Sequence, residues 1–304
     1  MNNKLILWAI AAFTALTSCS NKDSIEALDA NSKAQFTAGI LLTRASGSSW
    51  AAGDAIGVYM KNSGQELSAA SIAEKVENYK HVTAAGDGVF AGNSPGQVAY
   101  FPVNGSPVDF VAYYPYKENI SNYSYPIDVT SQSDHPAIDL MYSDNATNKT
   151  KAAPQVALTF THRLVNLVVT LTAGDGLTAA DLKDATVSIT GQKTLGAMAL
   201  ATGIVTPSTT QTATQTVDLK MDGTNGAAII LPAAATTGRK LVMTISTGEV
   251  FEWEIPSTTA FDGGSKYIYN VTLNRTEVRV TSTITDWTTG NGAGNNVDAG
   301  QPNA

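Results

Sequence analysis

The chain has 304 residues, only 15% of them charged, and a net charge of −7. Phosphate neutralisation requires grouped lysine and arginine side chains, which this sequence lacks, so nucleic acid and anionic membrane surfaces are excluded as expected partners. The charged fraction is well below the roughly 25% typical of soluble domains, and the Thr, Ala, Ser, Gly and Asn that replace it are typical of extracellular β proteins.

The first segment has the pattern of an export signal. Lys4 precedes an apolar run at residues 5–16, and Leu16-Thr17-Ser18 leads into Cys19, the only cysteine of the chain. The run is shorter than the roughly 20 residues that span a bilayer and fits a secretory signal peptide. Its end resembles the lipobox of bacterial lipoproteins, so we expect a signal peptide at residues 1–18 and lipidation of Cys19. The alternative is an ordinary secretory signal with a cysteine nearby by chance.

The segment after the signal predicts a tether followed by a strand, together at residues 19–45. Apolar and small residues alternate from Phe36 to Thr43, which places Phe36, Ala38, Ile40 and Leu42 on one face of an extended chain. The strand ends at Arg44 and Ala45, before a Gly/Ser stretch that a protease could reach.

The remaining chain predicts an all-β protein with two β-sandwich domains in series. Short β-branched or aromatic runs are separated by turn residues throughout, first at residues 46–150 and then at 151–290. Residues 144–154 lack large apolar side chains and are the expected link between the domains. A Gly/Asn-rich tail at residues 291–304 is expected to be flexible.

Catalytic and metal-binding motifs are weak in this sequence. Residues 92–96 match G-x-S-x-G, but a strand pattern follows where the nucleophile elbow needs a helix, so a plain turn is preferred. His81, His135 and His162 have no metal-ligand spacing, and His162 is expected to be a hydrogen-bonded structural residue. We therefore expect no enzyme, no metal and no cofactor. A glycosidase acid pair among the scattered carboxylates is the least favoured alternative.

A tyrosine-rich segment offers a second functional hypothesis. Its side chains could stack on sugar rings, although in a sandwich they more often pack under loops. The cluster comprises Tyr113, Tyr114, Tyr116, Tyr123 and Tyr125. A cell-surface glycan-binding lipoprotein is therefore the alternative function.

Six phrases, in order, resemble the fimbrillin family of Bacteroidetes, the Mfa-like or FimA-type pilin subunits. They are Thr43-Arg44-Ala45, residues 50–60 (WAAGDAIGVYM), 108–116 (VDFVAYYPY), 139–142 (DLMY), 158–164 (LTFTHRL) and 284–287 (ITDW). The resemblance implies two transthyretin-like β-sandwich domains after a lipoprotein signal peptide. It also implies a fimbrial subunit that serves cell adhesion, exposed on the outer membrane and in the fimbrium.

The resemblance further implies assembly by strand exchange. In this family an arginine-specific protease removes the N-terminal strand, and a strand from another subunit fills the groove. Mapped onto this chain, the cut falls between Arg44 and Ala45; the alternative is that Arg44 is a surface residue in an intact strand. The implied partners are other fimbrillin subunits by β-strand complementation, the outer membrane through lipidated Cys19, and a host or bacterial surface ligand.

The C-terminal end departs from the stalk-pilin pattern of the family. Stalk subunits donate an apolar C-terminal strand, whereas residues 290–304 contain Val297 as their only large apolar residue. Either residues 278–284 are the donor, or the subunit accepts a strand and gives none. The second alternative is slightly favoured and corresponds to a tip or accessory position.

Overall fold

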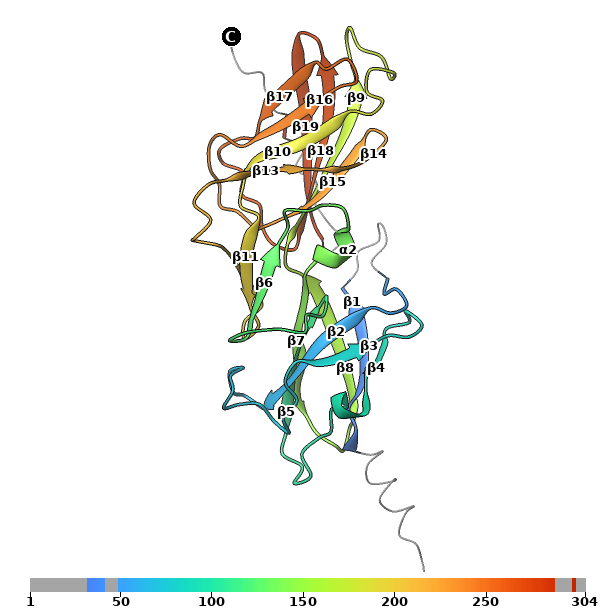
Figure 1. The fold of residues 1–304 in the computed structure, drawn as a ribbon, viewed down its shortest axis with the longest axis vertical. Helices are drawn as coiled ribbons and strands as arrows, with labels where there is room; N and C mark the ends of the chain where they lie inside the picture. Colours follow the sequence, from blue (N-terminus) through green and yellow to red (C-terminus); the bar gives the residue numbers. More distant parts are fainter. Residues whose placement is uncertain (1–31, 42–48, 288–296, 299–304) are drawn as a thin grey trace, which may run out of the picture.

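The computed structural model describes residues 32–41, 49–287 and 297–298. Figure 1 shows an elongated molecule with a barrel at one end and two packed sheets at the other. A small sheet and the short helix α2 (His135–Ile138) lie between them. None of the helices in the described ranges has the length and apolar composition needed to cross a membrane. The all-β prediction is confirmed.

The barrel is built from the first half of the sequence. Its seven strands pair in a closed ring, where the sequence predicted a sandwich. In ring order they are β1 (Gln35–Ile40), β4 (Val89–Gly92), β3 (Tyr79–Val82), β2 (Ala55–Asn62), β5 (Val108–Tyr114), β7 (Met141–Lys149) and β8 (Gln155–His162). The 3₁₀ helix η1 (Pro95–Gln97) lies between β4 and β5 in the sequence. Aromatic and branched side chains from these strands fill the barrel interior.

The second half of the chain forms two sheets that enclose a separate core. One sheet has the order β13 (Gln215–Asp218), β10 (Thr186–Gln192), β16 (Lys240–Thr244), β17 (Val250–Glu254). The other has the order β14 (Lys220–Asp222), β15 (Asn225–Ile230), β9 (Val165–Ala173), β18 (Ser265–Asn274), β19 (Glu277–Asp286), β20 (Val297–Asp298). Alternate residues of both sheets point into this core, among them Val169, Ile189, Leu241 and Val271.

A three-stranded sheet joins the two halves. It consists of β6 (Ser124–Asp128), β11 (Leu195–Ala199) and β12 (Ile204–Pro207), so a strand from the first half pairs with two from the second. A third core cluster lies beneath it and includes Tyr113 of β5 and Met198 of β11. Strand β5 is therefore covered on both faces, which explains why every residue from Val108 to Tyr114 is buried.

Residues 144–154, which the sequence predicted as the link between domains, lie within the barrel. Residues 144–149 belong to β7, and β8 pairs with β7 and β1 inside the barrel. The chain leaves the barrel only after His162, where β9 begins at Val165. Low apolar content at residues 144–154 reflects the exposed end of a strand and its turn, which composition does not distinguish from a linker.

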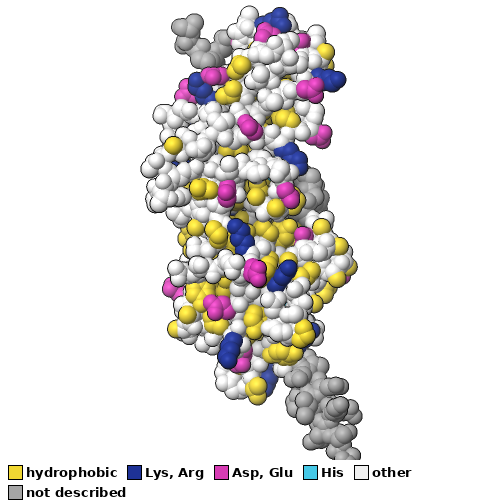
Figure 2. Space-filling view, viewed as in Figure 1, with side chains coloured by type: hydrophobic (Ala, Val, Ile, Leu, Met, Phe, Trp, Pro, Cys, Tyr) yellow, Lys and Arg dark blue, Asp and Glu magenta, His cyan; other side chains and the backbone are white. Residues whose placement is uncertain are grey.

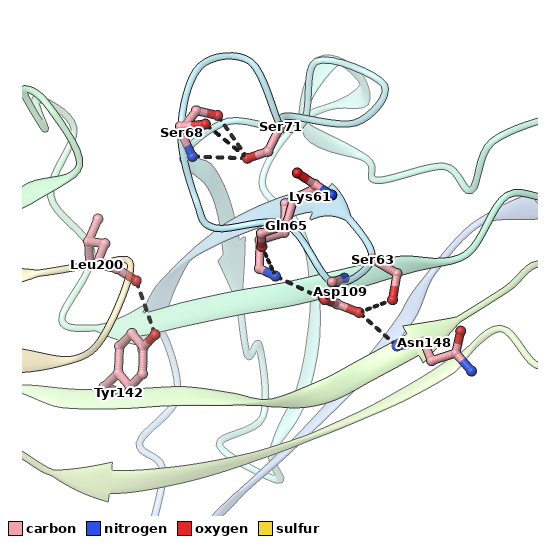
Figure 3. Close-up of polar contacts among 10 residues, drawn as sticks. Lys61, Ser63, Gln65, Ser68, Ser71, Asp109, Tyr142, Asn148 and Leu200 are labelled. Carbon is pink, nitrogen blue, oxygen red and sulfur yellow. Dashed lines mark hydrogen bonds and ion pairs between the residues drawn. The ribbon is translucent and has the colours of Figure 1, made fainter.

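Asp109 of β5 ties together the loops at one end of the barrel, as Figure 3 shows. Its carboxylate accepts hydrogen bonds from Ser63 Oγ (2.7 Å) and from the backbone amides of Gly64 (2.9 Å) and Asn148 (2.8 Å), and it pairs with Lys61 Nζ at 2.9 Å. Burial alone would raise the pKa of Asp109, but these donors outweigh it and lower the pKa to about 2. The loops are thereby fixed by a buried anion.

Candidate functional site

Strand β1 closes the barrel. It runs parallel to β8 over six paired positions and antiparallel to β4 over two. The other strands form a continuous series from β4 to β8 without it. Since β1 precedes them in the sequence, one cut between Leu41 and Ser49 would separate it from the rest of the barrel.

The side chains of β1 alternate as the sequence predicted. Phe36 and Ala38 are buried, and Ile40 is partly buried against the same core. Thr37 and Gly39 face outward. The predicted strand over residues 36–43 is therefore confirmed for its described part, and its apolar face is the part of β1 that seals the barrel.

Phe36 is the main apolar anchor of β1. Its ring makes edge-to-face contacts with His81 and Phe110, with centroids 4.8 and 5.2 Å apart. Burial lowers the pKa of His81 to about 4, so its imidazole is neutral at physiological pH. The anchor thus sits in a pocket that is apolar and uncharged at that pH.

Trp50 and Gly88 hold the backbone of β1. The indole Nε1 of Trp50 donates to Ala38 O at 2.8 Å, and the Ala38 amide donates to Gly88 O at 2.8 Å. Gly88 has a φ of +81°, and a Cβ there would lie 2.6 Å from Ala38 O. Only glycine accommodates both the left-handed conformation and this close approach.

The predicted lipidation and cleavage residues lie outside the described residues. Cys19, Arg44 and Ala45 all fall there, as do positions 42 and 43 of the predicted strand. Lipidation of Cys19 and cleavage at Arg44 therefore stay predictions.

His162 is the hydrogen-bonded structural residue that the sequence indicated. Its Nδ1 lies 2.8 Å from Asp139 Oδ1, so the ring donates to the carboxylate through this nitrogen. The indole ring of Trp287 stacks on the imidazole ring of His162, with ring centroids 3.8 Å apart. His135 lines the same cavity as His162, a proximity that their separation in the sequence concealed.

Three of the five tyrosines in the tyrosine-rich segment are buried, whereas Tyr116 and Tyr123 are partly exposed. Tyr113, Tyr114 and Tyr125 are buried. The hydroxyl of Tyr113 bonds to Asn78 Oδ1 at 2.5 Å, and that of Tyr114 donates to Asp54 Oδ1 at 3.1 Å. These three side chains are therefore not available as an open stacking surface for sugar rings, although Tyr114 also lines an internal cavity.

The charged surface and the remaining motifs can be located in the described residues. Figure 2 shows lysine, arginine and acidic side chains spread over one face of the molecule, several of them beside a side chain of opposite charge. Ser94 lies between β4 and η1, and η1 is a single exposed 3₁₀ turn and not the α-helix that follows a nucleophile elbow. Among the described residues, no group of three or more His, Cys, Asp or Glu side chains is placed to hold a metal ion.

The proposed C-terminal donor, residues 278–284, is an integral part of the second half. It lies within β19, which pairs with β18 along its full length and buries Val280 in the core. The described part of the Gly/Asn-rich tail is β20, which pairs with β19 at Val297 and Asp298. The position of β19 favours a strand that stays within its own subunit.

Sequence reasoning missed a second arrangement of residues near the end of β1. Trp50, Asp54, Asp139 and Trp287 line a cavity together with His162. A signal for it was present, because each belongs to a phrase that carries the family resemblance. The phrases indicate the family, but their positions along the sequence do not predict that these residues lie close together in space.

Comparisons with known proteins agree with the family suggested by the sequence. The fimbrillin-like family model matches residues 43–287. "Putative fimbrium subunit Fim1C" of Bacteroides uniformis is 39% identical over 97% of this chain and 98% of its own length.

Two solved structures share the fold. A "putative cell adhesion protein" of Bacteroides uniformis is 40% identical, with a TM-score of 0.75 over 84% of this chain and 99% of that one. A second, from Bacteroides ovatus, is 19% identical, with a TM-score of 0.67 over 84% of this chain and 97% of that one. The match to the family model and the full-length relative show that the chain belongs to the fimbrillin-like family.

Proposed function

We propose that this protein is a fimbrial subunit that reaches the cell surface as a lipoprotein, loses β1 by proteolysis and assembles by strand exchange in an adhesive appendage. Its membership of the fimbrillin-like family supports the fimbrial and adhesive role. The observation that carries the mechanism is the position of β1, which precedes the other barrel strands in the sequence and closes the ring between β4 and β8.

Removal of β1 would leave unpaired strand edges and an exposed apolar cavity, and a strand from another subunit could fill both. The edges of β4 and β8 would lose their backbone partners, and the cavity left by Phe36 and Ala38 would expose apolar side chains. Unpaired strand edges readily accept strands from other chains. A donor that alternates apolar and small residues would restore both the ladder and the core.

In this proposal, export depends on Cys19 and maturation depends on Arg44. Lipidation of Cys19 would hold the precursor on the outer membrane, and cleavage after Arg44 would free the barrel from the lipid and from β1 together. A pocket that is already shaped for a strand then becomes the assembly site.

We further propose a tip or accessory position. Strand β19 is committed to its own sheet, and the tail beyond it has little apolar content. A subunit at the tip accepts a strand and needs no donor of its own, whereas a stalk subunit needs both.

A digestion experiment tests the proposal. The purified precursor is treated with an arginine-specific protease, and the products are examined by N-terminal sequencing and size-exclusion chromatography with light scattering. We expect a new N-terminus at Ala45 and a monomer that binds an added donor strand only after the cut, since the subunit offers no donor of its own. The matched control, Arg44→Ala, should keep β1 and bind no added strand. Cutting at other arginines while the bond after Arg44 resists would contradict the proposal.

A peptide experiment isolates the strand-exchange step. A labelled peptide with the sequence of residues 33–41 is added to the cleaved protein from which β1 has been separated under mild denaturant. We expect binding, and at least a hundredfold weaker binding for the Phe36→Ala peptide, because loss of a buried Phe costs about 3–5 kcal/mol. The Thr37→Ala peptide is the matched control, since Thr37 faces outward. Equal affinities for the two altered peptides would argue against insertion into the barrel.

Immunogold electron microscopy separates the tip from the stalk. Antibody against the second half of the chain should label fimbriae at their ends. Labelling along the whole filament would exclude the tip position and leave the strand-exchange proposal intact.

A further inference from the structure

A cavity of about 280 Å³ lies where the end of β1 meets the second half of the molecule. Its walls come from β1, the segment after it, α2, β8, β9 and the residue that follows β19. This volume lies just below the range for ligand pockets, roughly 300–1,000 Å³, and suits one side chain or a molecule of that size.

Three polar atoms at this cavity are buried without a hydrogen-bond partner in the described part of the chain. They are His135 Nε2, His162 Nε2 and Asn166 Oδ1, and all three residues line the cavity. His162 is 3% exposed. An unpartnered buried polar atom costs about 1–3 kcal/mol, so three around one space indicate a missing polar occupant.

The chemistry of the walls sets the charge of that occupant. Asp54 and Asp139 contribute carboxylates, and no lysine or arginine is among the described lining residues. Lys220 acts on His135 electrostatically and donates a hydrogen bond from its ammonium group to Ser133 O. An anion would meet two carboxylates here, whereas a cation would be attracted by them.

The walls offer hydrogen-bond acceptors. In the imidazole tautomer whose Nδ1 donates to Asp139, the Nε2 of His162 carries the lone pair and accepts. Asn166 presents its carbonyl oxygen. Burial lowers the pKa of His135, which favours its neutral form as well.

The side chains that line the cavity favour a planar organic cation. Trp50, Tyr114 and Trp287 supply aromatic walls. A guanidinium group is planar, carries five donors and stacks on aromatic rings, so it suits acceptors and aromatic walls together. A bare metal ion would need a tighter set of ligands than the described residues provide.

We propose that this cavity binds a guanidinium group, supplied by an arginine side chain of a peptide or by a free guanidinium compound. The carboxylate of Asp139 pairs with the cation, His162 Nε2 and Asn166 Oδ1 accept its hydrogen bonds, and the aromatic rings cover its faces. The binding requires no strand exchange and no cleavage of this chain.

Residues far apart in the sequence are brought together for this site. Each phrase of the family resemblance except Thr43-Arg44-Ala45 contributes at least one lining residue: Trp50, Ala51 and Asp54, then Tyr114, then Asp139 and Met141, then His162, then Trp287. Asp54 and Asp139 already accept structural hydrogen bonds, so the orphaned acceptors are the feature that packing alone leaves unexplained.

The test uses the intact purified chain and three probes: agmatine, the peptide acetyl-Gly-Arg-Gly-amide, and the same peptide with citrulline, the neutral isostere of arginine. Calorimetry gives the affinities, and ¹⁵N spectra of the imidazoles report on His135 and His162 directly. We expect agmatine and the arginine peptide to bind at least tenfold more tightly than the citrulline peptide and to shift the Nε2 signal of His162.

The comparison of agmatine with the arginine peptide identifies the source of the group. Tighter binding of the peptide indicates an arginine on a partner chain, and equal binding indicates a free guanidinium compound; both support the site. The variant Asp139→Asn should weaken both probes at least fivefold, while Asp181→Asn, a residue in the second half, should not. Equal affinity for the citrulline peptide, or unchanged imidazole signals at saturation, would overturn the proposal without recourse to any variant.

Discussion

The indole ring of Trp287 lies flat on the imidazole ring of His162, with ring centroids 3.8 Å apart and planes 4° from parallel. His162 ends β8 of the barrel, and Trp287 follows β19 of the second half. The Trp287 amide also donates to Gly264 O at 2.7 Å, which fixes the backbone beneath the ring. The pair is therefore a direct contact between the two halves of the molecule.

Loss of this stack should loosen the connection between the halves. We expect Trp287→Ala to lower the free energy of unfolding by about 2–4 kcal/mol, because it removes a large aromatic contact. Trp287→Phe keeps a flat ring and should cost less than half as much. Calorimetric unfolding measures both, and similar losses for the two variants would show that the ring stack is not what matters.

The hydrogen bond from Trp50 to β1 should control how readily β1 leaves. Trp50→Phe keeps an aromatic ring but removes the donor to Ala38 O, so the carbonyl loses a buried partner at a cost of about 1–3 kcal/mol. We expect faster hydrogen exchange at the amides of β1, measured by mass spectrometry. Trp253→Phe, in the second half, is the control and should leave the exchange of β1 unchanged.

Gly203 should be intolerant of any side chain. Its φ is +67°, and a Cβ there would lie 2.6 Å from the ring of Tyr142, whose hydroxyl donates to Leu200 O at 3.0 Å (Figure 3). We expect Gly203→Ala to destabilise the protein by about 2–4 kcal/mol through both strain and overlap.

Gly223 provides a matched control for that substitution. It has a φ of +60° and open space around its hypothetical Cβ. Gly223→Ala should therefore cost only the backbone strain, about 1 kcal/mol. Chemical denaturation of the two variants separates overlap from strain, and equal losses would mean that Tyr142 moves aside.

His81 should make the barrel sensitive to mild acid. Its pKa is about 4 in the folded protein against an ordinary value of 6.5, because the ring is buried beside Phe36. The unfolded chain therefore binds a proton at a higher pH than the folded chain, and stability falls as the pH decreases from about 6.5 to 4, by on the order of 3 kcal/mol. The electrostatic influence of Lys33 acts in the same direction.

Variants at two histidines can assign this pH dependence. Stability measured by urea denaturation from pH 7 to 4 should fall less steeply for His81→Gln than for the natural protein. His135→Gln should retain the contribution of His81. An unaltered slope in the first variant would contradict the assignment.

Asp109 should control how the stability of the protein depends on pH below about pH 4. Its hydrogen bonds lower its pKa from 3.8 to about 2, so they stabilise the fold above pH 4 and are lost as the pH falls from about 4 to 2. Asp109→Asn removes the charge and should reduce stability at pH 7 by about 2–4 kcal/mol, with a flatter profile below pH 4. Asp222→Asn, at an exposed position of β14, is the control at neutral pH.

Local sequence patterns were sufficient to predict individual strands, but they did not predict which strands pair with one another. The alternation at Phe36 and Ala38 predicted β1, and short branched runs predicted an all-β fold. The pairing of β8 with β1 was not predictable, because the ladder joins segments that are distant in the sequence and leaves no periodic trace in either. The division at residue 150 failed to anticipate that pairing for the same reason.

The sequence by itself determined the class of the protein: a β protein of the fimbrillin-like family, with an N-terminal strand ahead of its main body. These properties depend on composition, local alternation and short phrases, all of which are written along the chain. The tertiary structure alone decided that β1 closes a barrel between β4 and β8, and that Asp139, His162 and Trp287 surround one cavity. Side-chain proximity arises from packing over long sequence distances, and no local pattern encodes it.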